Sequence, residues 1–126
     1  MKIQLDNWRV IDLDLKSVQE EDSKNENSFD LKTGHFFPEN EPKEFGVGFE
    51  IEIKDIEFNL SIESVFIFKV DEEITEEFKV SDFPKINAPA IAFPFLRAYI
   101  SNITLQSGYK PVMLPSINFV SLAEEE

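Results

Sequence analysis

The strongest constraint on the fold is the alternation of residues between Gly46 and Val70. Before Asp55, apolar residues occupy every second position and charged residues lie between them. This period places the apolar side chains on one face of a strand. After Asp55 the apolar positions shift by one residue, which requires a turn or a bulge. We predict a hairpin whose turn falls in "FNLSIES", residues 58–64, where turn-forming residues are few.

Further strands are predicted around this hairpin. The stretch "WRVIDLDLKSV", residues 8–18, alternates in the same way, and Phe29–Thr33 can form a short strand. Between them, Gln19–Ser28 is polar and reads as a loop. Residues 34–46, "GHFFPENEPKEFG", contain two prolines and read as a connection. The hairpin ends in "VFIFKV", residues 65–70, which is apolar on both faces; we expect cover on both sides, one side by another subunit.

The C-terminal half is expected to hold one long helix. Because proline is tolerated in the first helical turn, we predict a start at Pro94 and a stop at Gly108. The preceding "DEEITEEFKVSDF", residues 71–83, fits helical or strand spacing, and we favour a strand. After Gly108, the prolines of "YKPVMLPSINF" predict an extended, irregular arm. Strands first and a helix last predict a single α+β domain, residues 1–126, with an antiparallel four-stranded sheet.

The charge of the chain limits its partners. Asp and Glu number 25 against 12 Lys and Arg, so the net charge is −13. This argues against nucleic acid or an anionic membrane and favours basic or unfolded polypeptides. Cysteine is absent, no secretory signal is visible, and no apolar run approaches the roughly 20 residues of a membrane span. We therefore expect a soluble cytoplasmic protein with no membrane insertion.

Residues that could carry catalysis are few. His35 is the single histidine, and a lone histidine in a loop is more often solvated than catalytic. Zinc sites need more Cys or His, and the four glycines are too scattered for a phosphate loop. Arg97 lies among apolar residues, either as a snorkelling or paired structural arginine or as a ligand contact. The sequence predicts no enzyme, cofactor or metal.

Residues 93–119 carry a more specific order of residues. An aromatic-proline-aromatic start is followed by an arginine three residues after the proline, a glycine-aromatic break and the ending "LPSINF". This order resembles the hallmark of the SecB family of export chaperones. The matching residues are Phe93, Pro94, Phe95, Arg97, Ile100, Gly108, Tyr109, Pro111, Leu114, Pro115, Ile117, Asn118 and Phe119.

The resemblance implies an ATP-independent chaperone that holds unfolded polypeptides in hydrophobic grooves. It also implies a homotetramer, a dimer of dimers that the long helix helps to join. Roles in a client groove or an interface are implied for Phe93, Phe95, Tyr99, Met113, Leu114, Ile117 and Phe119. Roles in the oligomer interface are implied for Phe68, Val70, Leu96, Ile100 and Ile103.

The chain departs from the family pattern after Phe119. Family members continue into a further helix and a tail that contacts the translocase motor SecA, whereas this sequence ends seven residues later. We therefore expect a short variant without that helix and tail, and we assign no SecA-contact residue. Lys69 also stands where an acidic residue is common. Two alternatives remain open: a dedicated chaperone of a toxin–antitoxin pair, and an adaptor subunit that docks one folded partner.

Overall fold

The computed structural model describes residues 1–19 and 27–124. The chain forms two compact units, Met1–Glu73 and Ile74–Glu126, which are described separately. Most of the loop predicted at Gln19–Ser28 lies outside the described residues.

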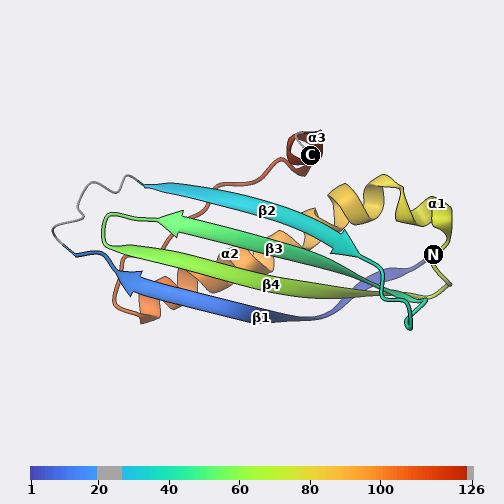
Figure 1. Cartoon of the computed structure of the whole chain (residues 1–126), viewed down its shortest axis with the longest axis horizontal. Coiled ribbons are helices and arrows are strands. Elements are labelled where there is room, and N and C mark those ends of the chain that lie inside the picture. Colours follow the sequence, from blue (N-terminus) through green and yellow to red (C-terminus); the bar gives the residue numbers. More distant parts are fainter. Residues whose placement is uncertain (20–26, 125–126) are drawn as a thin grey trace. The chain divides into compact units, whose positions relative to one another are not determined.

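The first unit is a four-stranded antiparallel sheet. Its strands are β1 (Ile3–Ser17), β2 (Ser28–Phe36), β3 (Glu44–Lys54) and β4 (Phe58–Val70). Their order across the sheet is β1-β4-β3-β2 (Figure 1). The four predicted strands are confirmed. The prediction that His35 lies in a loop is wrong, because β2 runs through it and the connection to β3 is shorter than predicted.

The turn between β3 and β4 lies earlier than residues 58–64. Asp55 N–H donates to the carbonyl of Phe58 at 2.9 Å, and Glu57 N–H donates to the Asp55 carboxylate at 2.9 Å. An aspartate side chain can close a turn in this way without glycine. The phase shift after Asp55 is therefore the turn itself, and β4 is one uninterrupted strand.

One face of the sheet is buried and rich in aromatic residues. The Phe45 and Phe68 rings stack with their centroids 5.0 Å apart, and Trp8 stacks on Phe66 at 4.9 Å. Such ring contacts add to the burial of apolar area. The fully or nearly fully buried side chains of β3 and β4 are Phe45, Val47, Phe49, Ile51, Ile53, Phe58, Leu60, Ile62, Phe66, Phe68 and Val70.

The opposite face of the sheet, called the outer face below, is polar along much of its length. Near the ends of the strands, Lys69 lies 3.6 Å from Asp6 and 3.8 Å from Glu44, which joins β4 to both neighbours. On the same face, Val65 and Ile67 of the doubly apolar stretch are half-buried. The ring of Phe36 covers Gly46 so closely that a Cβ there would overlap it.

The second unit begins with two short helical segments. The prediction of a strand at residues 71–83 is wrong, because α1 (Glu76–Lys79) forms there. Thr75 caps it by accepting a hydrogen bond from Phe78 N–H at 3.1 Å. Glu76 and Glu77 lie in its first turn, where the positive end of the helix dipole favours negative side chains. A five-residue π-helix, η2 (Phe83–Asn87), then leads into the long helix.

The long helix, α2 (Ala88–Gln106), begins six residues before Pro94. The predicted start is therefore wrong. Pro89 occupies the first turn, where a missing N–H costs nothing, and Pro94 lies inside the helix. The predicted end is confirmed. Gly108 has φ +95°, and its N–H bonds to the Leu105 carbonyl, a glycine-terminated helix end.

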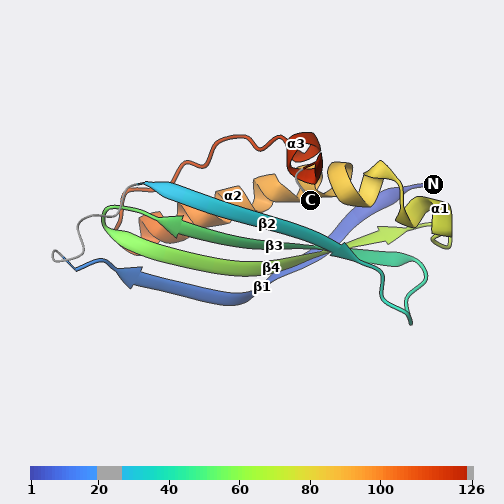
Figure 2. The ribbon, with the colours of Figure 1, turned by 45° about the horizontal axis from the view of Figure 1, so that its top comes forward.

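The irregular arm is confirmed over residues 109–118 and runs back along α2 (Figure 2). It ends in the short helix α3 (Phe119–Glu124), which the sequence did not predict. Asn118 caps α3, since its side-chain oxygen accepts from Ser121 N–H at 3.1 Å. The Phe119 ring then meets Phe93 of α2 edge to face, with centroids 5.7 Å apart.

Candidate functional site

The second unit exposes a row of residues along α2. Ile91, Phe95 and Leu105 are 46%, 51% and 56% exposed, and Ala98 and Asn102 between them are also exposed. Their spacing of four, three, four and three residues places all five on one face of the helix. These five residues are called the α2 stripe below. Its spacing is that of the contact positions of paired helices, in which a single Asn fixes the register.

The opposite side of α2 is buried. Leu96, Ile100 and Thr104 have no exposed surface, and Phe93 is 2% exposed. The helix thus has an inner apolar side and the exposed stripe. Two apolar sides exceed what a helix on the surface of a globular protein normally carries. The α2 stripe is therefore a candidate contact surface.

The arm adds a further exposed apolar residue to those of the α2 stripe. Met113 is 82% exposed and lies beside α2, where the Ser101 hydroxyl approaches its sulfur at 3.7 Å. Leu114 and Phe119, which follow Met113 in the chain, are buried, at 8% and 6% exposure. Methionine is flexible and polarizable, so it can adapt to ligand side chains of different shape.

The residues predicted for a client groove are brought together, with different exposures. All seven lie on α2, the arm or the start of α3. Phe95 and Met113 are exposed, Tyr99 and Ile117 are half-buried, and Phe93, Leu114 and Phe119 are buried. Among the predicted interface residues, Phe68, Val70, Leu96 and Ile100 are buried in the single chain and Ile103 is half-buried. Both assignments stay predictions.

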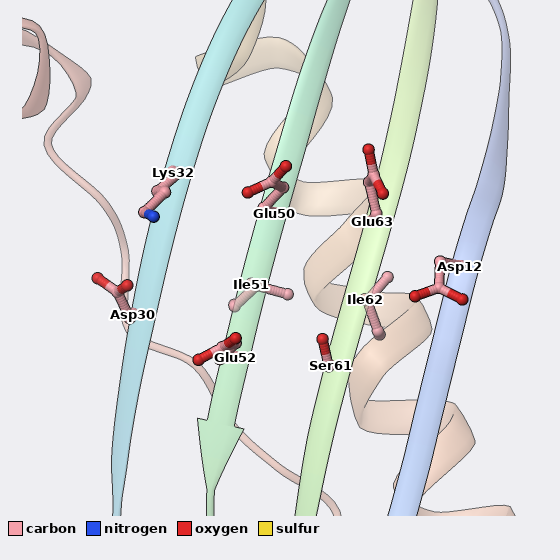
Figure 3. Close-up of a pocket in the computed structure, with 9 residues that line it drawn as sticks. All are labelled: Asp12, Asp30, Lys32, Glu50, Ile51, Glu52, Ser61, Ile62 and Glu63. Carbon is pink, nitrogen blue, oxygen red and sulfur yellow. The ribbon is translucent and has the colours of Figure 1, made fainter.

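The outer face of the sheet carries a row of carboxylates (Figure 3). Glu63 of β4 lies directly opposite Glu50 of β3 on one side and Asp12 of β1 on the other. Lys32 ends this row on β2, and Asp30 and Glu52 form an acidic pair in the next row. A shallow pocket of about 140 Å³ lies among them. Like charges at directly opposed positions destabilise a sheet.

Next to the acidic row, the outer face is hollowed by glycine. Gly34 and Gly48 are paired across β2 and β3, and a Cβ on Gly34 would meet nothing within 4 Å. A pocket of about 290 Å³ lies over them, bordered by Glu50, Glu63 and Val65. The alternation before Asp55 predicts that charged residues such as Glu50 lie on the face opposite the apolar residues. The strand register, which places these residues in rows, could not be read from the sequence.

Catalytic and metal chemistry find little support in the described residues. No cluster of three or more His, Asp or Glu there could hold a metal ion. His35 is exposed on β2, with its ring 5.7 Å from that of Phe37. Arg97 is half-buried on α2. No helix within residues 1–19 and 27–124 has the length and apolar character needed to cross a membrane.

Comparison with known proteins gives a consistent result. Residues 13–126 match the family model of SecB, described as preprotein translocase subunit SecB. An uncharacterized protein of Methanocaldococcus jannaschii is 36% identical, over 89% of this chain and 75% of that one. The protein-export protein SecB of Magnetococcus marinus is 30% identical, over 91% of this chain and 81% of that one.

A solved structure agrees in fold. It is the Mycobacterium tuberculosis SecB-like chaperone in complex with a peptide from the HigA1 antitoxin, with a TM-score of 0.69 over 91% of this chain and 87% of that one. The two sequences are 14% identical, so this likeness concerns the fold alone. Because the family model covers nearly the whole chain and the fold agrees, the chain belongs to the SecB family.

Proposed function

We propose that this protein is an ATP-independent chaperone that holds unfolded polypeptides. The observation that carries the proposal is the exposed apolar side chain of Met113 on the arm. A flexible methionine can contact many apolar side chains without reading their sequence. Membership in the SecB family supports the same role.

The charge of the chain supports this choice of ligand. A net charge of −13 attracts polypeptides with basic segments and keeps a chain with exposed apolar residues soluble. Unfolded chains offer both apolar and basic segments. We assign no residue to contact with the motor SecA.

Binding of an unfolded chain tests the proposal directly. We expect a soluble complex, detected by light scattering, when the protein is mixed with a reduced and alkylated test polypeptide. Met113→Asp should weaken that complex. Val80→Asp is the matched control, because Val80 is equally exposed, at 87% against 82%, and lies outside the proposed surface. A wild-type protein that forms no complex with the unfolded chain would refute the holdase function.

We further propose that the α2 stripe joins two copies of the chain, as one of the two interfaces that a homotetramer built as a dimer of dimers needs. The stripe is nearly symmetric about Ala98, with Ile91 and Leu105 at equal distances in sequence on either side. Two such stripes can therefore meet in antiparallel orientation, with the small Ala98 allowing close approach. The same residue order suits a twofold interface, in which one patch contacts its own copy.

The solution mass tests the stripe. We expect Leu105→Glu to lower the oligomeric mass measured by light scattering, because it places a charge in an apolar contact. Ser107→Glu is the control, since it adds the same charge two residues away on an exposed position outside the stripe, whereas Gln106 bonds to Asn102 of the stripe. A wild-type monomer, or a Leu105→Glu protein of unchanged mass, would reject the stripe as the interface.

A dedicated chaperone of an antitoxin is the second candidate. The structural likeness to a SecB-like chaperone that was solved with an antitoxin peptide favours it over the adaptor role. The two candidate functions differ in the range of polypeptides that the protein binds. A general holdase binds unrelated unfolded chains with similar affinity, whereas a dedicated chaperone binds one partner far more tightly than the rest.

A further inference from the structure

Thr104 is one of two fully buried polar residues in the described part of the chain, the other being Ser64. It lies near the C-terminal end of α2, on the buried side of the helix. Threonine is a weaker helix former than most residues, and a hydroxyl that bonds back to the preceding turn does not strengthen the helix. Formation of the helix therefore does not explain a hydroxyl at this position.

The contacts of the hydroxyl point to the arm instead. Thr104 Oγ1 donates to the carbonyl of Ile100 at 2.8 Å, with the carbonyl of Ser101 at 3.1 Å as a second acceptor. The same oxygen accepts a hydrogen bond from Val112 N–H at 3.1 Å. The backbone adds a second link to the arm, because Tyr109 N–H bonds to the Thr104 carbonyl at 3.0 Å.

The Val112 bond is the point at which the arm is fastened to α2. Pro111 and Pro115 have no N–H, so between them only Val112, Met113 and Leu114 can donate. Of these three, Val112 alone has an acceptor among the described residues. The far end of the arm is held separately, at the Asn118 cap of α3 and the contact between Phe119 and Phe93.

We propose that Thr104 is a positioning residue, whose hydroxyl fixes the arm against α2 and so sets the place at which Met113 meets a polypeptide client. This inference rests on the proposed holdase function. Met113 directly follows Val112, so the bond fixes the backbone one residue before the exposed side chain. Without the bond, only the Ser101 contact and the buried Leu114 hold this part of the arm, so the position of Met113 beside α2 is less sharply fixed.

Two substitutions separate the hydroxyl from the shape of the side chain. Thr104→Val keeps the β-branched shape and removes the hydroxyl, and Thr104→Ser keeps the hydroxyl. We expect hydrogen exchange of the Val112 amide to accelerate by about tenfold or more in Thr104→Val, the effect of losing one buried hydrogen bond. Thr104→Ser should retain most of the protection. The amide of Met113, which has no acceptor, is the internal reference.

The client measurement completes the test. Dissociation of a labelled, reduced and alkylated test polypeptide should become several-fold faster in Thr104→Val and return toward the wild-type rate in Thr104→Ser. Thr75→Val serves as the control and should leave dissociation unchanged, because it removes a threonine hydroxyl in the same way at the cap of α1 and leaves the Val112 bond intact. Wild-type protein that does not bind the polypeptide rejects the holdase function. Wild-type binding with unchanged Val112 exchange, or unchanged dissociation, in Thr104→Val rejects the positioning role.

Discussion

The carboxylate row on the outer face should make the sheet less stable than the same sheet with a neutral side chain at Glu63. Glu63 directly faces Glu50 and Asp12, and all three side chains are exposed. We expect Glu63→Gln to raise the free energy of unfolding, because the substitution removes both repulsions and keeps the shape and the hydrogen-bonding oxygen of the side chain. The acidic face then contributes to binding or solubility at a cost in stability.

The size of the gain follows from the register. A directly opposed pair of charges in a sheet is worth roughly 0.2–1 kcal/mol, so two pairs give about 0.4–2 kcal/mol. Two unit charges about 5 Å apart in water repel by about 0.8 kcal/mol, which falls within the range for one pair. Salt reduces the effect, since the Debye length falls to about 3 Å at about 1 M.

Urea unfolding followed by circular dichroism measures this gain, since urea carries no charge and leaves ionic strength under separate control. The gain should be largest in dilute buffer and shrink at about 1 M salt. Glu44→Gln is the matched control on the same face, because Glu44 faces Lys69 at 3.8 Å and its neutralisation should not stabilise. A Glu63→Gln protein with no gain in dilute buffer, or a gain that salt leaves unchanged, would refute the reasoning.

Three further substitutions test local features by urea unfolding. Thr75→Ala should lower stability by about 1 kcal/mol, because it removes the cap of α1; unchanged stability would mean that the cap contributes nothing. Gly108→Ala should cost about 1 kcal/mol, because φ +95° strains any residue with a Cβ, and a neutral result would contradict that conformation. Pro94→Ala should stabilise by about 1 kcal/mol or more, because it restores a helical N–H; a loss would mean that proline is required there.

Period-two alternation predicted the sheet well because its two faces differ so strongly. Each residue from Phe49 to Lys54 is either apolar and buried or polar and exposed, so strand type and facing follow from the pattern. The turn lies earlier than predicted because an aspartate side chain, and not a glycine, closes it. Asp55 closes the turn with its carboxylate, and that bond to Glu57 N–H becomes visible only when the backbone is folded.

The helical unit was harder to predict because its signals conflict. Pro89 and Pro94 both look like breakers, yet the first lies in the first turn and the second inside α2. The start of α1 did have a signal, a threonine followed by two glutamates, which apolar spacing alone overlooks. The bond from Val112 to Thr104 has no sequence signature, since it joins residues eight apart across the helix end.

The two apolar sides of α2 show why the sequence alone could not assign residues to the candidate site. Leu96 and Ile100 form one side, and Phe95 and Leu105 lie on the other, with no difference in apolar character to rank them. Burial separates them, because the first pair has no exposed surface and the second pair is more than half exposed. A helix that buries one side within its own chain leaves the other side for partners. Contact with other copies of the chain is therefore expected to begin at Phe95 and Leu105.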